Sequence, residues 1–160
     1  MNKSWIANGF TAANALFGGL SIMMSISGEY HMASICILIA MVADTFDGRV
    51  ARALGTAGPM GVELDSLSDD ISFGVAAGAL MYSYQLRELG ALGFIPCALL
   101  GAFCAFRLAR FNVKVTSVHG YFEGLPCPTV GVIIACYVLS GVKIWNWLAM
   151  VCVLALAVLM

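Results

Sequence analysis

The stretch Asp44–Asp70, DTFDGRVARALGTAGPMGVELDSLSDD, holds six of the nine acidic residues of a chain that is otherwise strongly apolar. Hydrophobic residues make up 61% of the 160 positions, charged residues make up 11%, and the mean hydropathy is +0.93. Soluble domains carry about 25% charged residues. The composition therefore predicts a membrane protein that concentrates its carboxylates, and we expect no nucleic-acid partner.

On both sides of this stretch, hydropathy divides the chain into six apolar segments joined by short polar turns. A membrane-crossing helix needs about 20 mainly apolar residues. The predicted spans are Ala12–Ile26, Met32–Leu54, Met60–Tyr84, Leu89–Arg110, Pro128–Val142 and Trp145–Met160. The turns leave no room for a soluble domain, so we expect an all-α fold of about six transmembrane helices in one integral-membrane domain, residues 1–160.

The basic residues indicate an orientation. Two of them, Arg87 and Lys143, fall on one side of the predicted spans, and six fall on the other: Lys3, Arg49, Arg52, Arg107, Arg110 and Lys114. Cytoplasmic loops carry the excess of Lys and Arg. We therefore expect an integral protein of the cytoplasmic membrane whose acidic stretch faces the cytoplasm. The N-terminus lacks the ordered regions of a cleaved signal peptide, and the apolar last helix leaves room for a chain that continues past Met160.

The carboxylates form two pairs. Asp44 and Asp47 are separated by three positions, and Asp65 and Asp69 by four, so each pair shares one face of its helix. A short glycine-containing turn joins the two helices, which predicts antiparallel neighbours with four converging carboxylates. Uncompensated, these charges are costly in a membrane. Arginines are one source of compensation, but an all-oxygen set suits Mg²⁺ or Mn²⁺ better, and two such ions offset four charges.

Small residues accompany the acids. Gly48, Ala51 and Gly61 lie on or beside the acidic face. Small side chains let a bulky ligand approach the backbone, although glycine is also ordinary in membrane helix packing. Two metal ions held by shared carboxylates stabilise both the attacking and the leaving oxygen of a phosphoryl displacement. The combination therefore indicates an enzyme of phosphoryl transfer.

The spacing D-x2-D-G-x2-A-R-x8-G-x3-D-x3-D, from Asp44 to Asp69, resembles the signature of the CDP-alcohol phosphatidyltransferase family at all eight fixed positions. The resemblance implies a six-helix membrane core, a homodimer, and replacement of CMP on a CDP-linked lipid by an alcohol. It implies two divalent cations, Mn²⁺ or Mg²⁺, on four ligands: Asp44, Asp47, Asp65 and Asp69. It assigns the cytidine diphosphate to Gly48, Arg52 and Gly61, and the role of general base to Asp69.

Three further stretches, ELDSLSDDISFGVA, FRLARFNV and FEGLPCPTVG, resemble the small metal-dependent phosphatidylserine synthases within that family. This resemblance includes Asn14, which we place in the CDP-lipid site, and departs at Ala77, where those proteins often have Pro. It implies L-serine as acceptor and CDP-diacylglycerol or CDP-archaeol as donor. Arg107, Arg110 and Asn112 are the expected acceptor site, since arginine grips a carboxylate in a planar fork. Topological anchoring is the alternative role for the two arginines.

Two other functions remain open. A transferase of the same family that uses glycerol 3-phosphate or inositol phosphate would also need cationic side chains in its acceptor site. A divalent-cation transporter would explain intramembrane acids, because these mark ion pathways. It would not explain the glycine, alanine and arginine at fixed positions between them, so the transferase interpretation is favoured.

The remaining reactive side chains receive structural roles. The six cysteines have no C-x-x-C spacing and are expected to act as small hydrophobes in apolar runs. His31 and His119 are expected in separate turns, without the spacing of paired metal ligands. Ser66, Ser68 and Ser72 have no neighbouring histidine to act as a base, so we expect them in helix packing or ligand hydrogen bonds.

Overall fold

The computed structural model describes residues 4–55, 58–114 and 124–160, without the side chains of residues 4–7, 51, 52, 54 and 114. Throughout these ranges the regular structure is helical, which confirms the predicted all-α fold. The elements are α1 (Ser4–Ile26), α2 (Tyr30–Leu54), α3 (Pro59–Asp69), a π-helical segment (Asp70–Val75), α4 (Ala76–Tyr84), a 3₁₀ turn (Leu86–Leu89), α5 (Ala91–Lys114), α6 (Cys127–Leu139) and α7 (Asn146–Leu159).

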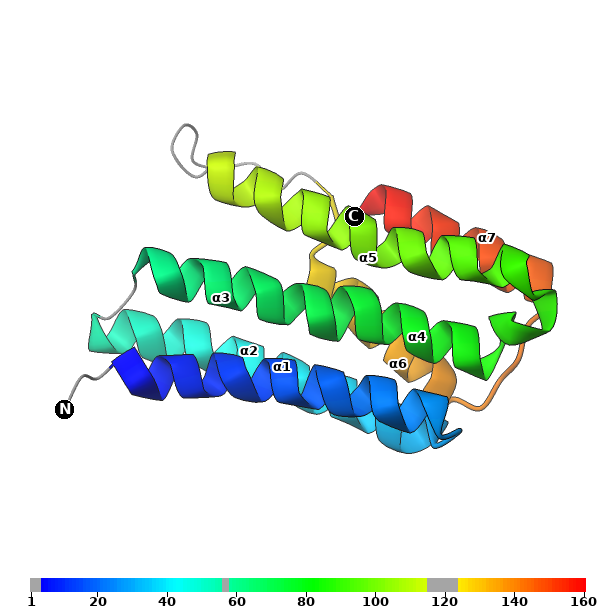
Figure 1. Ribbon diagram of the computed structural model, residues 1–160, viewed down its shortest axis with the longest axis horizontal. Helices are drawn as coiled ribbons and strands as arrows, with labels where there is room; N and C mark the ends of the chain where they lie inside the picture. Colours follow the sequence, from blue (N-terminus) through cyan, green and yellow to red (C-terminus); the bar gives the residue numbers. More distant parts are fainter. Residues whose placement is uncertain (1–3, 56–57, 115–123) are drawn as a thin grey trace.

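These elements follow the six predicted segments. The third is one rod in which the π-helical segment joins α3 to α4 (Figure 1). α1 begins at Ser4 rather than Ala12, because the polar residues before Ala12 lower the hydropathy without ending the helix. His31 lies inside the first turn of α2 instead of in a turn between helices. α2 ends before Gly55, whose φ of +64° stops a helix without steric cost, and Pro59 opens α3.

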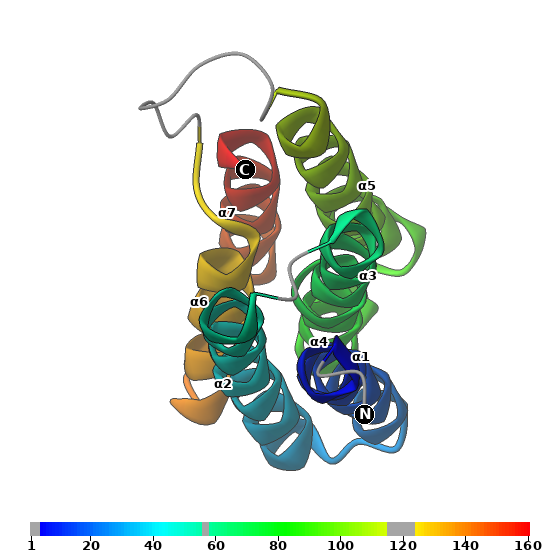
Figure 2. The same cartoon turned by 90° about the vertical axis from the view of Figure 1, so that its left-hand side faces the viewer.

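The helices form two layers. Viewed along the bundle, α1, the α3–α4 rod and α5 lie in one layer, and α2, α6 and α7 lie in the other (Figure 2). α1 packs along α2, α2 along α6, and α5 along α7. The buried side chains between the layers include Ile37, Phe73, Leu80, Leu100 and Val130. The α3–α4 rod is central. It contacts α1 and α5 in its own layer, and its α4 part contacts α2 and α6 in the other layer.

Glycines allow the rod to approach its neighbours closely. A Cβ atom at Gly18 of α1 would lie 2.9 Å from the Cα of Ser72, and one at Gly78 of α4 would lie 2.6 Å from the carbonyl oxygen of Cys97 on α5. Both distances are shorter than real side chains show. Small residues at helix contacts are typical of membrane helix packing. Gly18 thus lets α1 approach the rod at Ser72, and Gly78 lets α4 approach α5.

Two helical stretches of the described chain, Asn8–Ile26 and Ala91–Val113, are long and apolar enough by themselves to cross a membrane. The remaining rods differ in composition or length. α2 and the α3–α4 rod carry the acidic residues, while α6 and α7 have 13 and 14 residues. The prediction of six spans is therefore matched in helix order, and membrane crossing by all six stays a prediction.

Candidate metal and phosphate site

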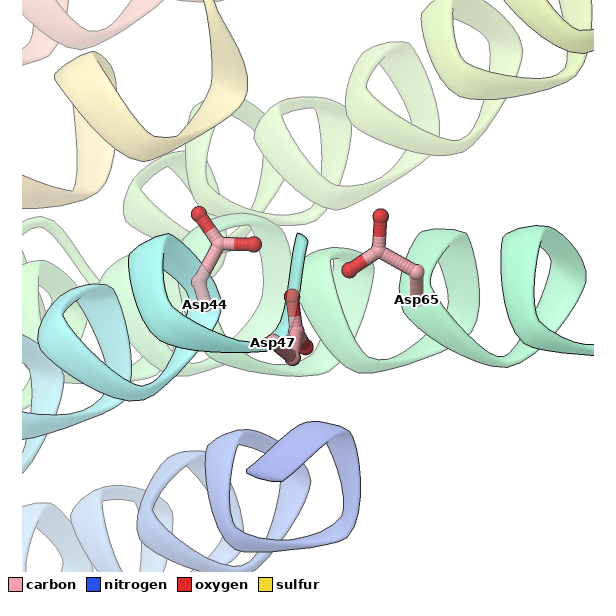
Figure 3. Close-up of side chains that lie close together, drawn as sticks. All are labelled: Asp44, Asp47 and Asp65. Carbon is pink, nitrogen blue, oxygen red and sulfur yellow. The ribbon is translucent and has the colours of Figure 1, made fainter. Parts of the chain in front are cut away.

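Three carboxylates meet between α2 and α3. One oxygen each of Asp44, Asp47 and Asp65 can be chosen so that all three atoms lie within 4.8 Å of one another (Figure 3). Asp44 and Asp47 come from α2, and Asp65 comes from α3, which runs in the opposite direction (Figure 1). Residues three apart on a helix lie on the same face, so Asp44 and Asp47 form one acidic face of α2, which lies close to Asp65 of α3. The expected convergence is thus present for these three residues.

Asp69 lies one helical turn beyond Asp65, deeper in the bundle. Its side chain is buried, and it is in hydrogen-bonding contact with Asp44. Asn14 of α1 donates a hydrogen bond from Nδ2 to Asp69 Oδ1, with the two atoms 3.0 Å apart. The Ser72 hydroxyl in turn donates to the carbonyl oxygen of Asn14 at 2.9 Å. α1 therefore fixes the fourth carboxylate in place.

The other carboxylates have unused acceptor atoms. Asp47 Oδ2 and Asp65 Oδ1 are buried and have no hydrogen-bond partner in the part of the chain that the structure describes. The Thr11 side chain also contacts Asp47. Buried polar atoms are normally paired, and buried charges normally have an opposite charge or a metal ion nearby. The donor set fits a hard divalent cation, because every ligand atom it offers is a carboxylate oxygen.

The residues assigned to the cytidine diphosphate belong to the same two helices as the acids. Gly48 follows Asp47 on α2 and is partly exposed. A Cβ atom built at Gly61 would have nothing within 4 Å. Glycine at position 61 is therefore not required by packing, and the space beside it is open. Arg52 lies on α2 one turn after Gly48, and its side chain is outside the described part of the structure.

The residues assigned to the acceptor occupy the end of α5. Asn112 donates from Nδ2 to the Ser66 hydroxyl at 3.0 Å, which links α5 to the residue that follows Asp65. Arg107 Nη1 lies 3.4 Å from Cys127 Sγ at the start of α6. Arg107 Nε is buried without a partner among the described residues. Arg110 is exposed. Asn112 is thus placed beside the acidic helix, and Arg107 is held by α6.

Several contacts were not anticipated from the sequence. Ser66 is the partner of Asn112, and Cys127 contacts Arg107, although we had expected Cys127 to act only as a small hydrophobe. Four cysteines are buried as expected, whereas Cys136 and Cys152 are exposed. Asp70 contacts Cys104 and lies outside the three-carboxylate group. Spacing along one helix contains no signal for such contacts between helices, and His119 lies outside the described residues.

Known proteins match the chain over nearly its whole length. The family model described as CDP-alcohol phosphatidyltransferase matches residues 4–159. A CDP-diacylglycerol–serine O-phosphatidyltransferase of Helicobacter pylori (strain ATCC 700392 / 26695) is 38% identical over 137 residues, which are 85% of this chain and 58% of that protein. The enzyme of the same name from Bacillus subtilis (strain 168) is 38% identical over 122 residues, 76% of this chain and 68% of that protein.

An archaeal relative carries a different lipid in its name. The archaetidylserine synthase of Methanothermobacter thermautotrophicus is 40% identical over 130 residues, which are 80% of this chain and 55% of that protein. The chain thus spans between about half and two thirds of the length of these relatives.

Proposed function

Because the chain belongs to the CDP-alcohol phosphatidyltransferase family, we propose that it transfers a phosphatidyl or archaetidyl group from a CDP-linked lipid to the hydroxyl of L-serine and releases CMP. The observation that carries the proposal is the set of carboxylates from α2 and α3 that meet around unused oxygens. The names of the relatives support serine as the acceptor. Both lipid types occur in those names, so the donor is CDP-diacylglycerol or CDP-archaeol.

The acidic residues hold the ions in this proposal. Asp44, Asp47, Asp65 and Asp69 would ligate two divalent cations, Mg²⁺ or Mn²⁺. Such ions neutralise the charge of the pyrophosphate oxygens when bound. Arg52 would supply a further cation, and Gly48 and Gly61 would leave room for the cytidine diphosphate. The open space beside Gly61 supports this placement.

Asp69 is the proposed general base. A bond forms from the serine hydroxyl oxygen to phosphorus as the bond from phosphorus to the CMP oxygen breaks, and the hydroxyl proton passes to Asp69. Proton removal matters because a neutral alcohol is a poor nucleophile. The hydrogen bond from Asn14 Nδ2 occupies Asp69 Oδ1 and orients the carboxylate. Asn14, which we expected to contact the CDP-lipid, therefore has a second role as a positioning residue.

The acceptor site is proposed at the cytoplasmic end of α5. Arg107 and Arg110 would hold the serine carboxylate, with Asn112 beside them. The buried Nε of Arg107 supports this role, because a planar guanidinium with a free donor is prepared for a second anionic partner. A phosphorylated acceptor could bind to the same two arginines. The assay below therefore compares serine with glycerol 3-phosphate and inositol phosphate.

The membrane placement is part of the proposal. We infer one integral-membrane domain with six spans in the cytoplasmic membrane, the acidic end on the cytoplasmic side, and a homodimer as in the family. Large apolar side chains on the outside of the bundle support burial in lipid: they include Leu16, Met23, Phe94, Phe106, Val151 and Val158, each more than half exposed. Exposed apolar surface of this extent is unusual in soluble monomers.

The test is CMP release by the purified protein with CDP-diacylglycerol and Mn²⁺. We expect release with L-serine, little with glycerol 3-phosphate or inositol phosphate, and none after chelation with EDTA. Stimulation by glycerol 3-phosphate but not serine would replace the acceptor and keep the reaction. Cation flux into liposomes without CMP release would favour the transporter instead.

A further inference from the structure

A hollow lies at the end of the bundle away from the acids. It has a volume of about 590 Å³ and lies between the end of α1, α4 and the beginning of α5. This is the right-hand end of the front layer in Figure 1, whereas the acidic residues lie toward the left. Its lining includes Ser25, Val75, Ala79, Tyr82, Arg87 and Ala98. None of these belongs to the site proposed for phosphatidyl transfer.

The lining changes character along the helices. Near the helix ends it carries a cation and hydroxyl groups, from Arg87, Ser25 and Tyr82. Toward the middle of the bundle it is apolar and built of small residues such as Ala79 and Ala98. The rod rises about 12 Å from Val75 to Ser83 at the helical rise per residue. The groove therefore has a charged end and an apolar end, as a lipid molecule has.

Two polar side chains of the lining, Ser25 and Arg87, have donors available for an anion. Ser25 is 1% exposed, and its hydroxyl has no hydrogen-bond partner within the described residues although it lines the groove. Arg87 is exposed at the rim. The neighbouring acid, Glu88, accepts a hydrogen bond from Asn146 of α7. A phosphate would give the guanidinium a charged, bidentate partner and give the serine hydroxyl an acceptor.

An aromatic pair forms the wall of the groove. Tyr82 stacks on Phe94 with ring centroids 4.2 Å apart. Tyrosine is enriched at membrane interfaces, where its ring is apolar on one side of the boundary and its hydroxyl is hydrated. The position of Tyr82 between Arg87 and Val75 in the lining therefore suits a headgroup beside Arg87 and an acyl chain that continues toward Val75.

We propose that this groove binds a glycerophospholipid with an anionic headgroup, whose phosphate contacts Arg87 and whose acyl chain lies between α4 and α5. The inference rests on the proposed membrane placement but not on the transfer reaction. The lipid binds at the end of the bundle opposite the acidic residues and takes no part in the transfer reaction. A second copy of this chain is the competing occupant, and the test separates the two.

The experiment is native mass spectrometry of the full chain in detergent with EDTA, titrated with palmitoyl-oleoyl phosphatidylglycerol or with the phosphatidylcholine of the same chains. We expect preference for phosphatidylglycerol. Arg87→Gln should weaken its binding about tenfold, as loss of one charge-assisted contact does. Lys143→Gln is the matched control, since Lys143 lies over the Tyr84 ring at the same end and does not line the groove. Equal binding by wild type and Arg87→Gln would refute the phosphate contact.

A second variant tests the acyl chain. Ala98 is exposed in the groove, so Ala98→Phe fills the space without entering the core. It should abolish the preferential binding, with an unchanged elution volume. If Ala98→Phe instead changes the oligomeric state and leaves lipid binding intact, the groove is a contact between chains and the proposal fails. Displacement of the lipid by glycerol phosphate at equal concentration would likewise contradict a role for the tail.

Discussion

Two polar clusters at opposite ends of the bundle differ in how completely their groups are paired. At the end away from the acids, Gln85 is buried and accepts a hydrogen bond from the Tyr137 hydroxyl. Its Nε2 donates to Asn146 Oδ1 at 3.1 Å and to the Ile144 carbonyl oxygen. The Ile144 amide donates back to Tyr137 at 3.1 Å. This network joins the end of α4 to α6 and α7, and it pairs the polar side-chain atoms of Gln85.

At the acidic end, polar groups converge but remain unused. Buried oxygens of Asp47, Asp65 and Asn14 have no partner within residues 4–55, 58–114 and 124–160. An unpaired buried acceptor costs free energy that a structural network would avoid. The difference indicates that the network around Gln85 stabilises the fold, and it supports our proposal that a ligand completes the open cluster. Variants at the two ends should therefore affect different properties.

The largest effect is expected at Asp69. Asp69→Asn keeps the shape and the contact with Asn14 but removes the proton acceptor, so turnover should fall by about 10²–10⁴ with CDP-lipid binding less affected. The measurement is CMP release at saturating Mn²⁺. Glu63→Gln on the exposed face of the same helix is the control and should retain activity. Turnover near that of wild type in Asp69→Asn would exclude Asp69 as the base.

A smaller effect is expected at Arg107. Arg107→Lys keeps the charge but loses the planar fork, so the KM for serine should rise about tenfold while the KM for CDP-lipid changes little. Arg110→Lys, at an exposed position, provides the comparison for a cation at the same end of α5. Steady-state kinetics with each substrate varied in turn gives both constants. An unchanged serine KM in Arg107→Lys and Arg107→Ala would remove Arg107 from the acceptor site.

The smallest effect on function is expected at Gln85. Gln85→Leu leaves the Tyr137 hydroxyl and the Ile144 carbonyl without their partner, and should lower the free energy of unfolding by about 1–3 kcal/mol. Divalent-ion affinity and turnover of the folded protein should not change. Thermal unfolding in detergent measures the change in stability. Ser27→Ala, which removes an exposed hydroxyl at the same end, is the control. Loss of ion affinity in Gln85→Leu would show that the two ends are coupled.

Much of the fold could be predicted because hydropathy and helix periodicity are local properties. The six segments, the turn at Gly55 and the meeting of Asp44 and Asp47 with Asp65 all follow from spacing and a short connection. The π-helical segment after Asp69 could not be predicted, because residue spacing does not distinguish it from an α-helix; Ser72 of this segment packs against Gly18 of α1. Contacts such as Asn14 with Asp69 depend on which helices become neighbours, and the sequence contains no signal for that choice.

The acceptor site shows the same limit. Arg107 and Arg110 differ by three positions and are similar in sequence context, yet one is held by Cys127 and the other is exposed. The difference between them depends on a contact between α5 and the start of α6, that of Arg107 with Cys127. Residue type and spacing therefore identified a group of cations but not the contact that Arg107 makes with Cys127.

Manganese binding tests the central claim most directly. Electron paramagnetic resonance of the purified protein during a Mn²⁺ titration should show two bound ions per chain with the magnetic coupling of neighbouring ions. Asp47→Asn and Asp65→Asn should each weaken binding at least about tenfold. Their thermal stability without metal should hold or rise, because each removes a charge from a crowded cluster. Wild-type affinity and coupling in both variants, or no bound ion in the wild type, would contradict a divalent-cation centre at these carboxylates.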